Sequence, residues 1–424
     1  MNLAWISLAA LAIAVTLSMV SKVNVGVVSL AFAWIVGVYL GNMPLNTVIG
    51  TFPIQLFLTL VGVTLLFGMA NVNGTLERLA ARAVRLCRGH TGIIPIMFFF
   101  VALTLATIGP GNIATTAILA PMAMAVGARA MVPPFLTALM VGNGAQAGAL
   151  SPFAPTGVIV NGLMDRIGLA GHQWQTFGNN LFAHAIVTFA AYFAFGGLRL
   201  FTHRPQPVEM AQSDQAGARA ETELVDAEPL GWVHWVTLSI LIALVLVVIF
   251  FEMNVGMAAL TGAAILSFCG AGNEREAIRK MPWGVVIMVC GVTVLIGVLE
   301  RTQGMTLFTD LLAKLASPGT VSLVIAFVTG LVSVYSSTSG VVLPAFLPTV
   351  PGLVERLGGA DALNIAGAMY VGGHLVDLSP LSTIGALCIA ALPEGADPRK
   401  LFNQLLAWGL SMTVVGAIIC WILF

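Results

Sequence analysis

The sequence predicts an all-α polytopic membrane protein built as two inverted repeats, each with about five transmembrane helices, one re-entrant hairpin and one broken helix. Of its 424 residues, 58% are hydrophobic and only 8% are charged, whereas about 25% of the residues in a soluble domain are charged. Apolar runs of about 20 residues, long enough to cross a bilayer as helices, recur along most of the chain. These runs lack the short alternating segments of a membrane β-barrel.

The first repeat is expected over residues 1–200. Its hairpin is interrupted at Gly109-Pro110-Gly111-Asn112, and its broken helix is interrupted between Ser151 and Pro155. An amphipathic helix with arginines between leucines precedes the hairpin and is typical of a helix that lies in the membrane interface. In chain order the repeat has spans at 2–20, 24–41 and 54–74, the interfacial helix 75–90, the hairpin 93–128, the broken helix 133–163 and the span 178–200.

A polar linker over 201–230 separates this repeat from the second, which is expected over 231–424. The linker contains six acidic residues and few apolar ones. The second hairpin is interrupted between Tyr335 and Gly340, and the second broken helix between Asp377 and Pro380. In chain order this repeat has spans at 231–251, 255–272 and 281–300, the interfacial helix 303–316, the hairpin 319–357, the broken helix 362–392 and the span 403–423.

Short identical triplets recur in the same order in both repeats. Gly62-Val63-Thr64 matches Gly291-Val292-Thr293, and Leu150-Ser151-Pro152 matches Leu378-Ser379-Pro380. If each hairpin enters and leaves on one side, each repeat crosses the membrane five times and the second repeat is inverted. With both termini outside, 14 of the 18 Lys and Arg residues fall on the cytoplasmic side, as the positive-inside rule requires. We therefore expect a multi-pass protein of the bacterial cytoplasmic membrane, with the linker in the cytoplasm.

Four breaks inside apolar spans indicate a binding site at the middle of the membrane, because irregular backbone at that depth persists only where it is buried or lines a cavity. Half-helix N-termini offer N–H donors to a carboxylate, and free carbonyl oxygens suit a hard cation such as sodium. The alternative is that the Ser and Thr hydroxyls only bond back to their own helices. The expected substrate-binding residues are Asn112, Thr115, Asn143, Ser151, Ser337, Thr338, Ser379 and Thr383.

One acidic residue within the membrane is the main candidate for binding the coupling ion. Asp377 is the single carboxylate inside a predicted core span, and such acids are functional candidates that either coordinate sodium or carry a proton. His374 stands three residues earlier, on the same helical face, so the two form either a functional or a purely structural pair. The expected sodium ligands are Gly111, Asn112, Thr156, Ser336 and Asp377.

Missing features also limit the function. No Lys or Arg lies deep in a predicted hairpin arm or break, which favours a small anion neutralised by co-transported cations over a phosphate-sized cargo. A net charge of zero gives no basis for nucleic-acid binding. The sequence has no Walker A, HExxH or GxSxG motif, so neither ATP-driven transport nor enzymatic activity is expected. The five scattered cysteines lack metal spacing, and no cofactor is expected.

The order of hairpins, broken helices and interfacial helices resembles the ion transporter superfamily, which includes the divalent-anion/sodium symporters. In that group each hairpin tip carries a Ser-Asn-Thr signature for sodium and the substrate carboxylate. Gly111-Asn112-Ile113 resembles the first signature with only Asn retained, and Ser336-Ser337-Thr338 resembles the second with Ser in place of Asn. These departures leave the individual ligands open.

The first 200 residues resemble the MatC-type dicarboxylate (malonate) carriers. The most specific stretch runs from Asn143 to Gly157. The resemblance implies a scaffold formed by the first spans of each repeat, a transport domain of hairpins and broken helices that moves as an elevator, and a homodimer in the bilayer.

The predicted function is cation-coupled transport of a small dicarboxylate such as malonate or a C4 acid, with sodium favoured over the proton as coupling ion. One alternative is a cation/proton antiporter of the same superfamily, in which Asp377 is the exchanging carboxylate and no organic substrate exists. A second alternative is a channel or sensor with a transporter fold. Dependence of uptake on substrate and sodium separates the three.

Overall fold

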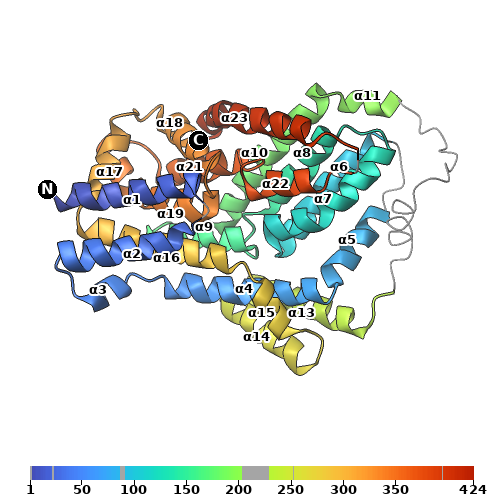
Figure 1. Cartoon of the computed structure of the whole chain (residues 1–424), viewed down its shortest axis with the longest axis horizontal. Coiled ribbons are helices and arrows are strands. Elements are labelled where there is room, and N and C mark those ends of the chain that lie inside the picture. Colours follow the sequence, from blue (N-terminus) through green and yellow to red (C-terminus); the bar gives the residue numbers. More distant parts are fainter. Residues whose placement is uncertain (1, 22, 86–90, 203–228, 252, 394) are drawn as a thin grey trace.

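All regular secondary structure in the described part of the chain is helical (Figure 1). The computed structural model describes residues 2–21, 23–85, 91–202, 229–251, 253–393 and 395–424. Within these residues, six helical stretches are long and apolar enough to cross a membrane: Ile54–Val72, Gly111–Arg129, Trp232–Phe251, Trp283–Arg301, Thr338–Leu357 and Pro398–Leu423. The prediction of an all-α polytopic membrane protein is therefore confirmed.

The helices of the first half follow the apolar spans, with local additions. They are α1 (Leu3–Val20), α2 (Val25–Trp34), the π-helix η1 (Ile35–Leu40), α3 (Leu45–Ile49), α4 (Ile54–Val72), α5 (Thr75–Arg85), α6 (Ile93–Ile108), α7 (Gly111–Arg129), α8 (Pro134–Gly148), α9 (Pro155–Arg166), α10 (Gln173–Ala194) and α11 (Gly197–Thr202). The span expected at 178–200 begins earlier, at Gln173, and is interrupted at Gly196, whose φ of +93° ends the helix.

The second half has a similar order of helices. They are α13 (Trp232–Phe251), α14 (Val255–Phe268), α15 (Glu274–Lys280), α16 (Trp283–Arg301), α17 (Gly304–Ala313), α18 (Val321–Ser333), the π-helix η2 (Thr338–Val342), α19 (Leu343–Phe346), the 3₁₀-helix η3 (Leu347–Thr349), α20 (Val350–Leu357), α21 (Ala362–Leu375), α22 (Thr383–Ala390) and α23 (Pro398–Leu423). Most of the linker, residues 203–228, and the end of the expected interfacial helix, residues 86–90, lie outside the described residues.

Two close helix crossings join the halves. α2 packs on α16, and α4 packs on α14. A Cβ atom on Gly291 would lie 2.2 Å from the carbonyl oxygen of Gly26, and one on Gly62 would lie 2.3 Å from that of Gly256. Because only glycine permits such backbone contact, these crossings hold α2 against α16 and α4 against α14. Contact of α16 with α4 joins the two pairs. Figure 1 shows α4, α14 and α15 together along the lower side of the molecule.

A second group of helices surrounds the four breaks. α8 packs on α6, α7 and α10, and α21 packs on α18 and α23. The two broken helices are each held by a similar hydrogen bond. The Ser151 hydroxyl donates to the carbonyl of Thr107 at 2.7 Å, and the Ser379 hydroxyl donates to the carbonyl of Val334 at 3.4 Å. These bonds tie each broken helix to the hairpin arm beside it.

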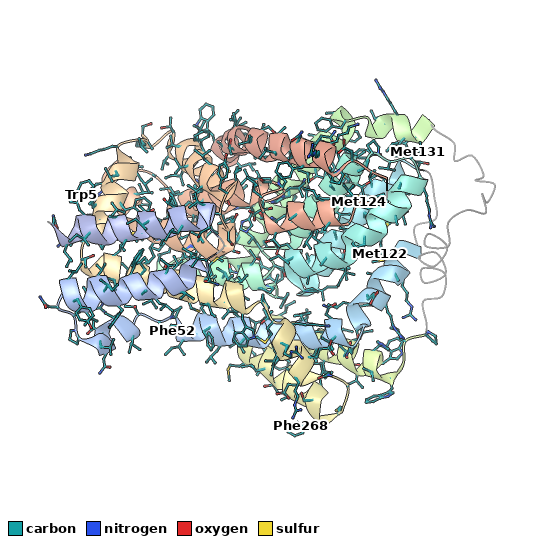
Figure 2. The ribbon with its side chains drawn as sticks, in the orientation of Figure 1. Trp5, Phe52, Met122, Met124, Met131 and Phe268 are labelled. Carbon is teal, nitrogen blue, oxygen red and sulfur yellow. The ribbon has the colours of Figure 1, made fainter. Side chains whose placement is uncertain are left out.

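Large apolar side chains cover much of the outer surface. Trp5 is 53% exposed and Phe268 is 92% exposed, and Figure 2 shows both at the periphery of the molecule. Exposed apolar area on this scale is unusual for a protein surrounded by water and suits contact with lipid. The surface therefore agrees with the composition in placing the chain in a bilayer.

Candidate functional site

Both hairpin tips and the break between α21 and α22 meet at one cavity of about 350 Å³. Its wall is completed by the α1–α2 loop and by Met288 of α16. The cavity therefore lies between the group of broken helices and the α2–α16 crossing. The polar residues that line it include Asn24, Asn112, Thr156, Ser336, Ser337, Thr338, Asp377, Ser382 and Thr383.

The first hairpin tip is shaped by two glycines between α6 and α7. Gly109 has φ +148° and Gly111 has φ +76°, conformations that other residues adopt only with strain. A Cβ atom on Gly109 would lie 1.9 Å from the ring of Phe67, so the tip packs tightly on α4. This turn starts α7 with Asn112 beside the cavity, where Asn112 is only 8% exposed.

The second hairpin tip carries its hydroxyl groups into contact with Asp377. The Thr338 hydroxyl donates to Asp377 Oδ1 at 2.5 Å and also bonds with the Ser333 hydroxyl. The Ser337 side chain accepts a hydrogen bond from Gly340 N at 3.1 Å and so caps the short π-helix η2. Both Thr338 and Ser337 are thus held in place by hydrogen bonds.

Gln146 of α8 lies between the first tip and the second break. Its Oε1 accepts a hydrogen bond from Asn112 Nδ2 at 2.7 Å. The amide lies beside the carboxylate of Asp377, and its Nε2 forms no hydrogen bond with any described atom. Asn112 Oδ1 in turn accepts from Ile113 N at 3.0 Å and from the Thr156 hydroxyl at 3.4 Å. Hydrogen bonds thus link Thr156, Asn112 and Gln146, and Asp377 lies beside the Gln146 end of this chain.

The cavity contains seven of the predicted site residues. Its lining includes Asn112, Thr156, Ser336, Ser337, Thr338, Asp377 and Thr383. Asp377 is the one charged side chain among the described lining residues; Lys22, in the adjoining α1–α2 loop, lies outside the described residues. A carboxylate among hydroxyl and amide oxygens is a donor set that suits a hard monovalent cation.

Six other predicted residues do not line this cavity. Ser151 and Ser379 hold the breaks together, as described above, and Gly111 shapes the first tip. Thr115 is fully buried in α7. Asn143 Oδ1 pairs with His184 Nδ1 at 3.2 Å, and His374 Nδ1 bonds the carbonyl of Tyr370 at 2.7 Å. The structure therefore places Asn143 and His374 in a buried polar cluster between α8, α10 and α21.

Several cavity residues were not predicted. Asn24 of the α1–α2 loop and Met288 of α16 form part of the wall, and Tyr335 precedes the second tip. Gln146 is completely buried behind the wall. The sequence marks Gln146 only as a polar residue inside an apolar span. Its contact with Asn112 bridges 34 positions, which no local pattern reveals.

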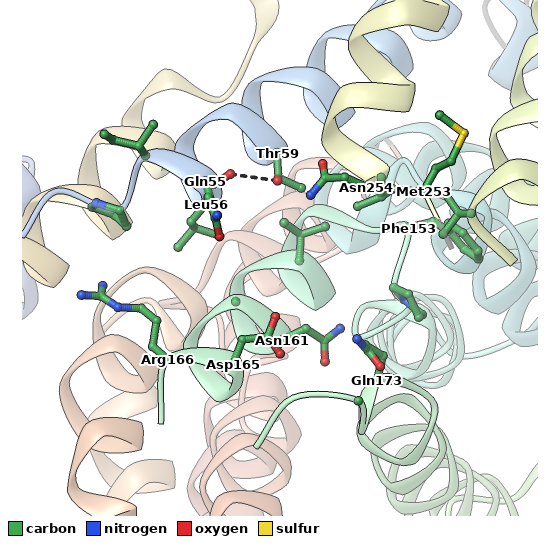
Figure 3. A pocket seen from close by; sticks show the side chains of 18 of the residues that line it. Gln55, Leu56, Thr59, Phe153, Asn161, Asp165, Arg166, Gln173, Met253 and Asn254 are labelled. Carbon is green, nitrogen blue, oxygen red and sulfur yellow. Dashed lines mark hydrogen bonds between the residues drawn. The ribbon is translucent and has the colours of Figure 1, made fainter. Parts of the chain in front are cut away.

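A larger cavity of about 930 Å³ lies between α4, the α13–α14 loop and α9 (Figure 3). Figure 3 shows Gln55 and Thr59 of α4 on one side and Asn161 and Asp165 of α9 on the other. Neither hairpin tip contributes to its lining. Beside this cavity α4 and α9 remain in contact, because a Cβ atom on Gly162 of α9 would lie 3.2 Å from Leu56 of α4.

Comparison with known proteins agrees with this architecture. The chain is similar to the solved structure of the Alcanivorax borkumensis YdaH transporter, with a TM-score of 0.59 and 17% identity over 91% of this chain and 88% of that one. It is also similar to Neisseria gonorrhoeae MtrF, whose description concerns a class of antimetabolite efflux pumps, with a TM-score of 0.58 and 12% identity over 91% of this chain and 84% of that one. At these identities the likeness concerns the fold alone.

The described part of the chain is thus a multi-helix protein with helices long and apolar enough to cross a membrane, and its fold is similar to that of two solved transporters. Residues 1–149 match the family described as the N-terminus of the dicarboxylate carrier protein MatC. The resemblance to MatC-type carriers that the sequence indicates is therefore confirmed over those residues. No curated protein matches the chain.

Proposed function

We propose that the chain is a secondary transporter that couples the uptake of a small dicarboxylate, malonate or a C4 acid, to the movement of sodium. The observation that carries this proposal is the convergence of both hairpin tips and Asp377 on one small cavity. Hydroxyl and amide donors there suit a carboxylate, and the Asp377 carboxylate attracts a cation. The match of residues 1–149 to dicarboxylate carriers supports the substrate class.

The test is uptake of radiolabelled malonate and succinate into proteoliposomes, with and without an inward sodium gradient at fixed pH. We expect saturable uptake that rises with the gradient. Absence of uptake of both acids by folded protein would instead favour the cation/proton antiporter. The observation that favours this second candidate is that Asp377 is the one charged side chain among the described lining residues.

We further propose that the chain consists of two inverted repeats. The paired glycine crossings of α2 with α16 and of α4 with α14 support this, because each joins the second span of one half to the third span of the other. The matched hydrogen bonds of Ser151 and Ser379 support it as well. Under the positive-inside rule both termini lie outside the bacterial cytoplasmic membrane.

The proposed mechanism is an elevator, in which the broken helices move as a body along the unit of α2, α4, α14 and α16. The 930 Å³ cavity between α4 and α9 supports this mechanism, because it leaves room beside the proposed moving body. The apolar outer surface of the stationary unit offers the contact for a homodimer.

A substitution at Gly162 tests this motion. A Cβ atom on Gly162 of α9 would lie 3.2 Å from Leu56 of α4, already a tight contact, so the Gly162→Leu side chain overpacks the contact between the two proposed bodies. We expect malonate binding within about threefold of wild type and an uptake rate reduced at least about tenfold, measured by calorimetry and by proteoliposome uptake. Gly178→Leu is the control, because nothing lies within 4 Å of a Cβ atom there. Equal uptake by the Gly162→Leu protein would argue against movement of α9 past α4.

The Asn112→Ala substitution tests the first hairpin tip. Removing the amide breaks the hydrogen bonds with Gln146 and Thr156 and leaves Gln146 Oε1 buried without its donor. We expect both the malonate KM and the sodium half-saturation concentration to rise at least about fivefold in uptake assays. Unchanged kinetics for both would remove Asn112 from the binding site.

A further inference from the structure

We infer that Gln146 is the positioning residue through which sodium binding strengthens substrate binding. This inference rests on the proposed function. Gln146 lies behind the cavity wall, between Asn112 of the first hairpin tip and Asp377 of the second break. Gln146 is fully buried, with 0% of its surface exposed. It does not line the cavity, so its side chain acts on Asn112 and Asp377 rather than on a ligand.

The orientation of the Gln146 amide is fixed from two sides. Asn112 Nδ2 can only donate, so the amide oxygen of Gln146 must point to the first hairpin tip. The Nε2 group then lies on the side of the Asp377 carboxylate, and it forms no hydrogen bond to Asp377 or to any other described atom. The α8 backbone is held here as well, because Asn180 Nδ2 donates to the Gln146 carbonyl at 2.7 Å. One buried amide therefore bonds Asn112 through its oxygen and lies beside Asp377 with its donor unsatisfied.

The two ends of the Gln146 amide, Nε2 and Oε1, connect a change at Asp377 to Asn112. Nε2 carries only donors, so its interaction with Asp377 depends on where the carboxylate oxygens lie and on how much of their charge a cation neutralises. A sodium ion that draws the carboxylate toward the second tip changes the partner available to Nε2. The same amide positions Asn112 through Oε1, so the change at Asp377 reaches the first tip, where the substrate carboxylate is expected to bind.

Thermodynamic linkage makes this inference measurable. If sodium raises malonate affinity by a factor, malonate raises sodium affinity by the same factor, and typical factors are about 5- to 150-fold. A residue that only supports the fold changes affinity at every sodium concentration equally. A residue that carries the coupling lowers the factor itself. The informative quantity is therefore the ratio of malonate dissociation constants in low and high sodium.

The experiment measures malonate binding to the purified full-length protein by calorimetry in sodium chloride and in choline chloride at equal ionic strength. Gln146→Met keeps the side-chain volume and removes both hydrogen-bonding groups. Gln146→Glu keeps an acceptor for Asn112 but replaces the donor that faces Asp377. In both variants we expect the sodium-dependent ratio to fall at least about fivefold, whatever the change in the dissociation constant measured in choline. Gln175→Leu is the control, because Gln175 is an exposed glutamine of α10.

The outcomes separate the inference from the proposed function. A wild-type ratio retained by either folded variant overturns the role of Gln146 and leaves the proposed function intact. A parallel loss of affinity in both salts, with an unchanged ratio, overturns the role too and makes Gln146 a structural residue. Absence of malonate binding, or of any sodium effect, in the wild-type protein overturns the proposed function and the inference together.

Discussion

Replacement of Asp377 by asparagine is expected to remove most of the sodium dependence of uptake while it leaves the ranking of substrates unchanged. The amide has the shape of the carboxylate, and its Oδ1 can still accept the hydrogen bond from Thr338. It lacks the negative charge that attracts a cation into a cavity where no other described lining residue is charged. We expect the sodium half-saturation concentration to rise at least about tenfold, which corresponds to about 1.4 kcal/mol.

The measurement is uptake of malonate and succinate at a series of sodium concentrations, with Glu355→Gln as a control for loss of a charge. Glu355 is exposed on α20 and does not line either described cavity. A sodium dependence equal to that of wild type would assign Asp377 a structural role. Proton-linked cation flux that is present in the wild-type protein and absent in the Asp377→Asn variant, without uptake of either acid, would point to the antiporter.

The membrane spans can be predicted from the sequence because each depends only on the residues of its own segment. An apolar run of about 20 residues is a consequence of lipid contact at that position alone, and helices such as α1 and α4 follow such runs closely. The breaks are similarly local, because Gly109 and Gly111 supply backbone conformations that other residues avoid. For the same reason Asn112 and Thr338 could be placed at the hairpin tips from sequence, and both line the cavity.

Features that depend on packing between distant segments were not predictable in this way. The short helices α3 and α15 lie between spans and contain too few residues to show a period. Asn143 and Ser151 have the same polarity as the cavity residues, yet one pairs with His184 and the other with a backbone carbonyl. Polarity in an apolar span identifies a residue that needs a partner, but whether that partner is protein or ligand is decided by the fold.

The same limit applies to the ligands of the coupling ion. Resemblance to the symporter signatures places Gly111 and Ser336 at the tips, but only Ser336 reaches the cavity lining. Gln146 bonds Asn112 and lies beside Asp377, although no signature includes it. The geometry of a hairpin tip follows from its own residues. The contact between the first tip and Asp377 depends instead on a residue of a neighbouring broken helix, Gln146 of α8.

The glycine crossings should be the most sensitive positions for folding. Gly291→Ala places a Cβ atom 2.2 Å from the carbonyl oxygen of Gly26, so α2 and α16 must separate along their contact. Overpacking of a well-packed interior costs about 1–3 kcal/mol, and close approach through small residues is what holds membrane helices together. We expect a marked fall in the thermal unfolding midpoint of the purified protein and in the yield of monodisperse protein.

Gly284→Ala on the same helix is the matched control. The nearest atom to a Cβ there is Asn24 Nδ2 at 3.6 Å, an ordinary contact. Alanine favours helix over glycine by about 1 kcal/mol, so this variant should unfold at or above the wild-type temperature. Gly256→Ala should behave like Gly291→Ala, because its Cβ would lie 2.4 Å from the Cα of Thr59 on α4. If only one of the two crossings proved sensitive, the halves would not contribute equally to the stationary unit, and the elevator proposal would have to place its fixed surface on that crossing alone.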